Sequence, residues 1–251
     1  AIENGKVYVL EANPRASRTV PLVSKVCNIR MVPLATDIIT SELTGRPSPV
    51  PELKEQKIPY YGVKEAVFPF NMFPGVDPVL GPEMRSTGEV LGLSESYGEA
   101  FFKAQEAASL KLPLEGTVLI SVNKKDKPEV VDVAKRFHED GFKIIATGKT
   151  CDLLNESGIP AEKVKKLYEG RPNILDMITN GKIDLVVNSP AGKESVHDDS
   201  YLRKAAIKAK IPYMTTIAAA KATAEGIGYV KAHMEENNVV KSLQQMHSEI
   251  Q

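Results

Sequence analysis

Residues 117–150 read TVLISVNKKDKPEVVDVAKRFHEDGFKIIATGKT and contain one strand–helix–strand pattern. The apolar run 117–122 predicts a strand, and 143–146 predicts a second. Between them, Pro128 suits the first turn of a helix and Gly141 suits its end. Apolar residues recur on one face of this helix at Val130, Val133, Ala134 and Phe137. The stretch therefore predicts a β-α-β unit.

Similar units follow in the rest of the chain. Further strand-like runs are residues 164–167, 183–187 and 212–215, and Pro172 and Gly181 bracket another helical run. Alternating strands and helices favour a parallel sheet with helices on both faces, joined by right-handed crossovers. We predict an α/β fold for residues 114–251, with a Rossmann-like five-stranded parallel sheet.

Residues 1–113 differ in character, because prolines and short apolar runs replace the regular alternation. The run 33–43 predicts a helix that Gly45 ends, and Asn4-Gly5 predicts a two-residue hairpin turn. Little sequence precedes this turn, so we expect the chain to be a piece of a longer protein. We interpret residues 1–113 as an α+β remnant of a larger domain.

Composition excludes several classes of partner. The 251 residues carry 32 basic and 32 acidic side chains, so the overall charge favours neither nucleic acid nor an anionic membrane. We find no membrane-spanning run and no leader peptide. Cys27 and Cys151 stand far apart, outside any metal-type spacing, and are expected to be buried, reduced thiols of a cytoplasmic protein.

Polar side chains follow several of the predicted strands. In parallel sheets, ligands bind beyond the carboxyl ends of the strands, where a helix start favours an anion. The candidate residues for a phosphorylated or carboxylated ligand are Lys127, Thr147, Thr150, Lys166 and Asn188. Taken singly, a threonine near a helix start is more often a cap than a ligand, and a loop lysine is usually only solvated, so the shared location carries the prediction.

A second candidate site lies near the start of the chain. Glu11 and Asn13 are two residues apart on a predicted strand and so would face the same side, with Arg15 close by. Carboxylate and amide oxygens suit Mg²⁺, and an arginine suits phosphate oxygens. The alternative is a salt-linked surface turn.

Catalytic machinery is not evident in this sequence. Three histidines, His138, His233 and His247, lie on predicted helices among charged neighbours. His197 precedes two aspartates on a predicted helix-entry loop, where a capping role is expected. Because no base or nucleophile has a partner, the second half reads as a binding module.

Several stretches resemble carbamoyl-phosphate synthetase large subunits, in the order found in that family. They are residues 10–25 (LEANPRASRTVPLVSK), 60–65 (YYGVKE), 70–78 (FNMFPGVDP), 81–90 (GPEMRSTGEV), 168–172 (YEGRP) and 245–247 (QMH). The resemblance covers essentially the whole chain and places residues 1–113 at the end of the second ATP-grasp unit. Residues 114–251 resemble the regulatory domain that shares its fold with methylglyoxal synthase.

The resemblance implies an ATP-dependent ligase that makes carbamoyl phosphate from bicarbonate and glutamine-derived ammonia, for pyrimidine and arginine synthesis. It implies Mg²⁺ or Mn²⁺ with ATP as cofactor, held by Glu11 and Asn13, with Arg15 on the ATP phosphate. The rest of that site would lie upstream, so this piece alone is expected to be inactive. Implied partners are the remainder of the large subunit, a glutaminase small subunit and another copy bound through the regulatory domain.

The resemblance also implies effectors. UMP or IMP would bind at Lys127, Thr147, Thr150, Lys166 and Asn188, and ornithine at Glu65, Tyr213 and Thr215. Pro190 replaces a threonine that contacts the nucleotide in enterobacterial relatives. Alternative interpretations are a free-standing nucleotide sensor or a lyase like methylglyoxal synthase, although Glu169-Gly170-Arg171-Pro172 stands where such a lyase has a Gly-Asp-Gln-Gln stretch.

Overall fold

The computed structural model describes residues 1–12, 14–47, 56–72, 83–189, 196–234 and 241–250. The chain forms two compact units. The first unit comprises Ala1–Ile58 with Lys241–Gln251, and the second comprises Pro59–Val240.

The first unit contains a short hairpin and isolated helices. Strands β1 (Ile2–Glu3) and β2 (Lys6–Val7) pair antiparallel around Asn4 and Gly5, whose φ angles are 49° and 75°. Positive φ at both positions is the geometry that Asn-Gly favours, so the predicted turn is confirmed. The helices of this unit are α1 (Thr19–Cys27), α2 (Met31–Thr44) and α9 (Leu243–Ser248), and Gly45 ends α2 with a φ of 65°.

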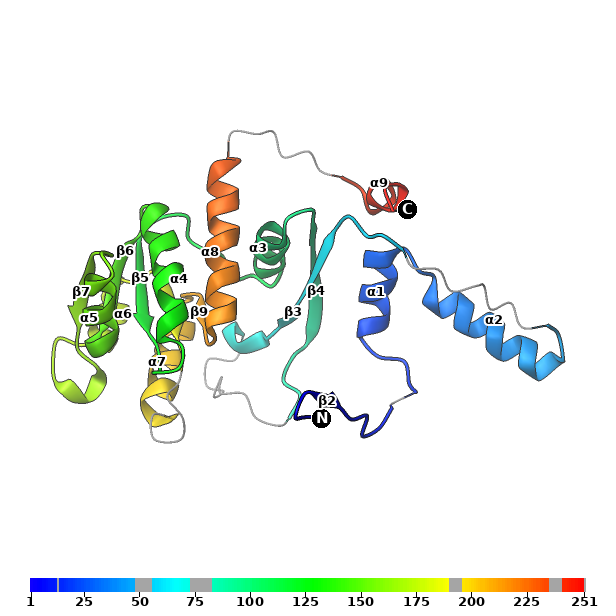
Figure 1. Cartoon of the computed structure of the whole chain (residues 1–251), viewed down its shortest axis with the longest axis horizontal. Coiled ribbons are helices and arrows are strands. Elements are labelled where there is room, and N and C mark those ends of the chain that lie inside the picture. The colour runs from blue at the N-terminus through cyan, green and yellow to red at the C-terminus, as the bar shows by residue number, and fades with distance from the viewer. Residues whose placement is uncertain (13, 48–55, 73–82, 190–195, 235–240, 251) are drawn as a thin grey trace. The chain divides into compact units, whose positions relative to one another are not determined.

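The second unit contains the predicted parallel sheet (Figure 1). Its strands lie in the order β7-β6-β5-β8-β9 and all pair in parallel. They are β5 (Thr117–Ser121), β6 (Lys143–Thr147), β7 (Ala161–Val164), β8 (Leu185–Asn188) and β9 (Tyr213–Met214). The helices are α4 (Lys127–Glu139), α5 (Gly148–Glu156), α6 (Ile174–Thr179), α7 (Val196–Lys208) and α8 (Ile217–Ala232). The predicted α/β fold is confirmed.

Two hydrophobic cores cover the two faces of this sheet. On β5, Val118 and Ile120 enter one core and Leu119 enters the other, because successive side chains of a strand point to opposite faces. The first core receives α4, α5 and α8, and the second receives α6 and α7. The four apolar residues predicted to form the core face of α4 are all buried in the first core.

The second unit also contains an antiparallel pair that precedes the sheet. Strand β3 (Tyr61–Val67) leads to the short 3-10 helix η1 (Pro69–Asn71), and then β4 (Gly88–Ser94) pairs with β3. Helix α3 (Tyr97–Ala107) packs on both strands and on α8. This unit includes residues from both sides of the predicted boundary at 113/114. The compact unit is defined by packing, whereas the predicted boundary separates two domains of different families. The domain boundary at 113/114 therefore stays a prediction.

Three local predictions were wrong. The third strand was predicted at 164–167 but ends at Val164, since Lys165 makes only an isolated bridge to Asn173. His197 lies inside α7 rather than on a loop before it. Both thiols are free, and Cys151 is buried as predicted, but Cys27 is only partly buried.

Candidate anion-binding site

The carboxyl ends of three neighbouring strands bring two of the predicted residues together. Ser121, the last residue of β5, is in register with Asn188 at the end of β8. On the other side of β5, Ile120 pairs with Ala146, so Thr147 at the end of β6 lies beside Ser121. Thr147 and Asn188 therefore flank a single residue at the same edge of the sheet.

Hydrogen bonds continue along this edge. The Thr147 hydroxyl donates to Ser121 Oγ at 3.0 Å, and the Asn188 amide donates to Tyr213 Oη at 2.5 Å. The backbone and side-chain N–H groups of Asn123 both donate to Ser189 Oγ, each at 3.1 Å. Thr147 and Asn188 are each only 3% exposed. Buried polar groups need partners, and these contacts hold both side chains in defined positions.

Helix α5 starts at this edge. Thr147 is its N-cap in an extended conformation and makes no side-chain capping bond. The first N–H groups of a helix lack partners within the helix, and together with the helix dipole they favour an anion. Thr150 lies in this first turn and is 3% exposed, and no hydrogen bond to its hydroxyl is found in the part of the chain that the structure describes.

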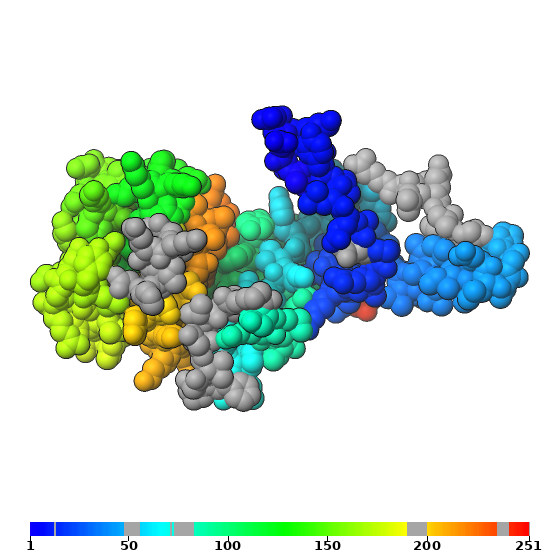
Figure 2. All heavy atoms as spheres, turned by 90° about the horizontal axis from the view of Figure 1, so that it is seen from below, coloured from blue at the N-terminus to red at the C-terminus, as the bar shows by residue number. Residues whose placement is uncertain are grey.

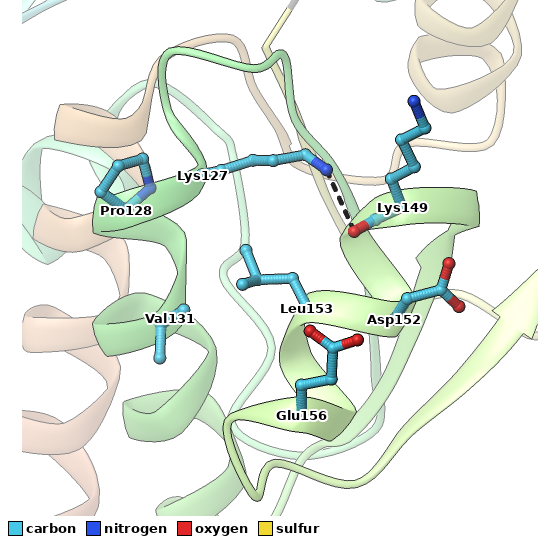
Figure 3. Close-up of a pocket in the computed structure, with 7 residues that line it drawn as sticks. All are labelled: Lys127, Pro128, Val131, Lys149, Asp152, Leu153 and Glu156. Atoms are coloured by element: carbon cyan, nitrogen blue, oxygen red, sulfur yellow. Dashed lines mark hydrogen bonds between the residues drawn. The ribbon is translucent and has the colours of Figure 1, made fainter.

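Two lysines supply positive charge. Lys127 is the first residue of α4, and its ammonium donates to the carbonyl of Lys149 at 3.1 Å (Figure 3). This contact bridges one end of a shallow groove between α4 and α5, with a volume of about 420 Å³. Lys166 follows β7, whose last residue Val164 pairs with Thr147. All five predicted anion contacts thus lie at or beyond the carboxyl ends of the strands, and their role as ligand contacts stays a prediction.

Residues beside the predicted set were missed from sequence. Ser121 Oγ accepts from the predicted residue Thr147, and Ser189 Oγ accepts from Asn123. Asn123 Oδ1 in turn accepts from the backbone N–H groups of Lys125 and Asp126 and so orients the loop into α4. Ser121 is the last residue of β5, whereas the sequence pattern predicts a strand that continues to Val122. Pro190 lies outside the described residues.

The predicted ornithine contacts come from two different sheets. Tyr213 lies on β9 with the Arg203 guanidinium 5.7 Å from its ring centre, and Thr215 follows that strand and is exposed. Glu65 lies on β3 and is half-buried. Burial raises the pKa of the Glu65 carboxyl, while donation from Gln105 Nε2 at 2.8 Å opposes the rise.

The predicted metal site is only partly described. Glu11 and Arg15 lie in the described part of the chain and Asn13 lies outside it. The expected strand geometry is wrong for Glu11, because β2 ends at Val7. Across the described ranges, no group of three or more His, Cys, Asp and Glu side chains could hold a metal ion. The role of Glu11 and Asn13 as metal ligands stays a prediction.

The side chains of three histidines are either exposed or hydrogen-bonded to a backbone carbonyl. His138 lies exposed on α4, whereas His233 Nδ1–H donates to the Tyr229 carbonyl at 2.7 Å. His247 Nε2–H donates to the Lys25 carbonyl at 2.6 Å and so ties α9 to the end of α1. None of these contacts pairs a histidine with a nucleophile.

No helix in the described ranges is long and apolar enough to cross a membrane.

The fold and this edge define an α/β domain that presents buried hydroxyl and amide groups beside a helix start. Residues 129–215 match the family model of the MGS-like domain. A carbamoyl phosphate synthase large chain of Archaeoglobus fulgidus is 48% identical over 99% of this chain, which covers 23% of that relative. A C-terminal section of that large chain from Methanopyrus kandleri is 49% identical over 98% of this chain, which covers 45% of it. Over nearly its whole length, the chain is homologous to part of the carbamoyl phosphate synthase large chain.

The chain therefore spans less than half the length of these two relatives. A solved methylglyoxal synthase from Elizabethkingia anophelis NUHP1 aligns with 52% of this chain and 97% of its own at 18% identity. The TM-score of 0.40 is too low for that alignment to carry a functional comparison.

Proposed function

We propose that this chain is the regulatory portion of the large chain of a glutamine-hydrolysing carbamoyl phosphate synthase, and that its sheet edge binds a nucleotide effector. The complete enzyme would make carbamoyl phosphate from bicarbonate, glutamine-derived ammonia and ATP, for pyrimidine and arginine synthesis. Homology over nearly the whole chain supports the first part of this proposal.

One observation carries the second part: Thr147 and Asn188 are buried on either side of Ser121, and Thr147 directly precedes the start of α5. An effector phosphate would accept hydrogen bonds from the first N–H groups of α5 and from the Thr150 hydroxyl. The ammonium groups of Lys127 and Lys166 would balance the charge of the phosphate. The Asn188 amide would contact polar groups elsewhere on the effector. UMP and IMP are the proposed effectors.

The test is calorimetry of the whole chain with inorganic phosphate, UMP and IMP. Replacing Thr150 by Ala removes one hydrogen bond to a charged group, so we expect affinity to fall by roughly tenfold to a hundredfold. Thr179→Ala is the matched control, because among the described residues that hydroxyl bonds only to the Leu175 carbonyl of its own helix, at 2.8 Å. Unchanged affinity for all three ligands in Thr150→Ala would contradict the proposed site.

The ornithine site is proposed at Glu65, Tyr213 and Thr215. A half-buried carboxylate such as Glu65 is a suitable partner for an ammonium group, because partial burial strengthens the attraction between opposite charges. Ornithine should therefore bind the wild type more tightly than Glu65→Gln.

The remaining proposals concern the complete enzyme. Glu11 and Asn13 would hold Mg²⁺ or Mn²⁺ and Arg15 would contact the ATP phosphate, as part of a site completed by other residues of the large chain. The chain alone should form no carbamoyl phosphate from ATP, bicarbonate and ammonia, and product formed by the purified chain would disprove this. Its proposed partners are the rest of the large chain, a glutaminase small subunit and a second copy, in the cytoplasm.

A free lyase is less well supported. Glu169, which stands in the region where such an enzyme needs an acidic base, accepts the Lys166 backbone N–H at 2.8 Å. This contact satisfies a backbone N–H at the start of the 3-10 helix η2 (Leu167–Glu169), which is a structural role.

A further inference from the structure

A closed loop follows β7 and displays an aromatic ring. The loop begins at Lys165 and ends at Asn173, which form a parallel bridge, and Ile174 N–H donates to the Lys165 carbonyl at 3.0 Å. The Lys165 ammonium also donates to the Arg171 carbonyl at 3.4 Å. The tip is the 3-10 helix η2, and Tyr168 at its centre is 70% exposed.

The backbone around Tyr168 is fixed by local contacts. Glu169 N–H donates to the Lys166 carbonyl at 3.1 Å, and the Glu169 carboxylate accepts the Lys166 N–H at 2.8 Å. Gly170 then turns the chain with a φ of 98°, a conformation that side chains rarely permit. Single exposed aromatic residues are common and need no explanation. The position of Tyr168 is what distinguishes it.

Tyr168 stands next to the candidate anion site. Val164 pairs with Thr147 at the ends of β7 and β6, and Lys166 follows Val164 by two residues. The Lys166 ammonium lies 5.9 Å from the centre of the Tyr168 ring. One proposed phosphate contact therefore lies over the face of this ring. Figure 2, which views the second unit from the side where the loops leave the sheet, shows green surface of the α4 region and yellow-green surface of the segment after β7 on this face.

A nucleoside monophosphate carries a flat base besides its phosphate and ribose. The side chains of Thr147, Thr150 and Asn188 contain no ring. Tyr213 is only partly exposed and its hydroxyl accepts a hydrogen bond from Asn188. Bases stack on exposed aromatic side chains, and this interaction tolerates different bases because every base has a π-face. Tyr168 is an exposed ring on a loop closed by hydrogen bonds, beside a cation that suits the phosphate or ribose.

We infer that Tyr168 is the stacking platform for the base of a nucleoside monophosphate whose phosphate lies at the start of α5. This inference rests on the proposed function and adds the residue that distinguishes a nucleotide from a bare phosphate. Lys166 lies between the two parts of the ligand, and the closed loop keeps the ring in place before the ligand arrives.

The test is calorimetry of the whole chain with UMP, IMP, ribose 5-phosphate and inorganic phosphate. Stacking on one aromatic residue changes affinity by roughly fivefold to 150-fold. Tyr168→Ala should therefore lower the affinity for both nucleotides by about that factor. Ribose 5-phosphate and inorganic phosphate should bind with unchanged affinity. Tyr168→Phe and Tyr168→Trp keep a ring and should bind nucleotides about as well as the wild type.

Tyr8→Ala is the matched control. Tyr8 is also a partly exposed tyrosine with a lysine over its ring, since Lys6 Nζ lies 5.2 Å from the ring centre, but it belongs to the first unit. This variant should bind every ligand like the wild type.

The possible failures separate the two proposals. If neither phosphate nor nucleotide binds the wild type, the proposed effector site is wrong and this inference falls with it. If both bind and Tyr168→Ala leaves both affinities unchanged, only the stacking role is wrong. The same holds if this variant lowers the affinity for phosphate as much as the affinity for UMP. The latter result would show that Tyr168 merely positions Lys166.

Discussion

At the residue scale, the hydrogen bond between Asn188 and Tyr213 joins the ends of β8 and β9. The donor and acceptor are 2.5 Å apart, and Asn188 is almost fully buried. Tyr213→Phe removes this acceptor and leaves the ring in place. Because a net hydrogen bond contributes about 1 kcal/mol, we expect the free energy of unfolding to fall by about that amount in urea titration.

Tyr201→Phe is the control for this change. Tyr201 lies on α7 and is 62% exposed, so losing its hydroxyl should alter stability by less than about 0.5 kcal/mol. Equal stability of Tyr213→Phe and the wild type would show that water replaces the lost contact at no cost.

Glu65 gives a prediction about pH. Burial raises its pKa in the folded state, so between the ordinary glutamate pKa and the raised value the folded chain binds more protons than the unfolded chain. Stability contributed by this group is therefore present at low pH and is lost as the pH rises through that window. Glu65→Gln keeps a side-chain oxygen to accept from Gln105 and abolishes the titration.

The measurement is the free energy of unfolding of both proteins across mildly acidic to neutral pH. Relative to Glu65→Gln, the wild type should become less stable as the pH rises above the ordinary glutamate pKa. Parallel pH profiles would mean that Glu65 titrates alike in the folded and unfolded chains, and that burial has no net effect on its pKa.

At the element scale, close packing of α3 on β4 depends on Gly92. A Cβ atom added there would lie 1.9 Å from the Ala100 carbonyl oxygen and 2.6 Å from Ala104 N, both of which are backbone atoms. Gly92→Ala must therefore push the helix away from the strand, and we expect a loss of about 3 kcal/mol or more in chemical denaturation. Gly88→Ala is the matched control, because no atom lies within 4 Å of a Cβ at that position of the same strand. Similar stabilities of the two variants would contradict the packing explanation.

Periodicity predicted the sheet and the core face of α4, but it misplaced β7. Core strands such as β5 show long apolar runs because both faces are buried, whereas β7 lies at the edge and exposes Glu162 and Lys163. The apolar residues at 164 and 167 were therefore mistaken for the strand, although Leu167 belongs to η2.

The gathering of Thr147 and Asn188 at one edge follows from the rule for parallel sheets and was predictable. Their partners were not. Ser121 contacts Thr147, and Tyr213 contacts Asn188, through the register of strands that lie far apart in sequence. Such a register depends on tertiary packing, which spacing along one strand does not encode.

At the scale of the whole molecule, the two units differ in how much they bury. Every residue of the hydrophobic cores belongs to the second unit, whereas Ser41 is the only buried residue among those described in the first. Large apolar side chains on α2, including Ile39 and Leu43, are exposed. Because tertiary burial supplies most helical stability, α1 and α2 have little to hold them against local unfolding.

Native-state hydrogen exchange should therefore divide the chain. Amides of α1 and α2 should exchange with opening free energies near zero, while amides of β5, β6 and β8 should approach the free energy of global unfolding. The α4 helix, which buries four apolar residues, is an internal standard for a well-packed helix and should resemble the strands. Exchange of α1 and α2 as slow as that of α4 would mean that the first unit is stabilised by something other than burial within the chain, such as pairing with a second copy. Repeating the measurement over a range of chain concentrations would then show that pairing as protection that rises with concentration.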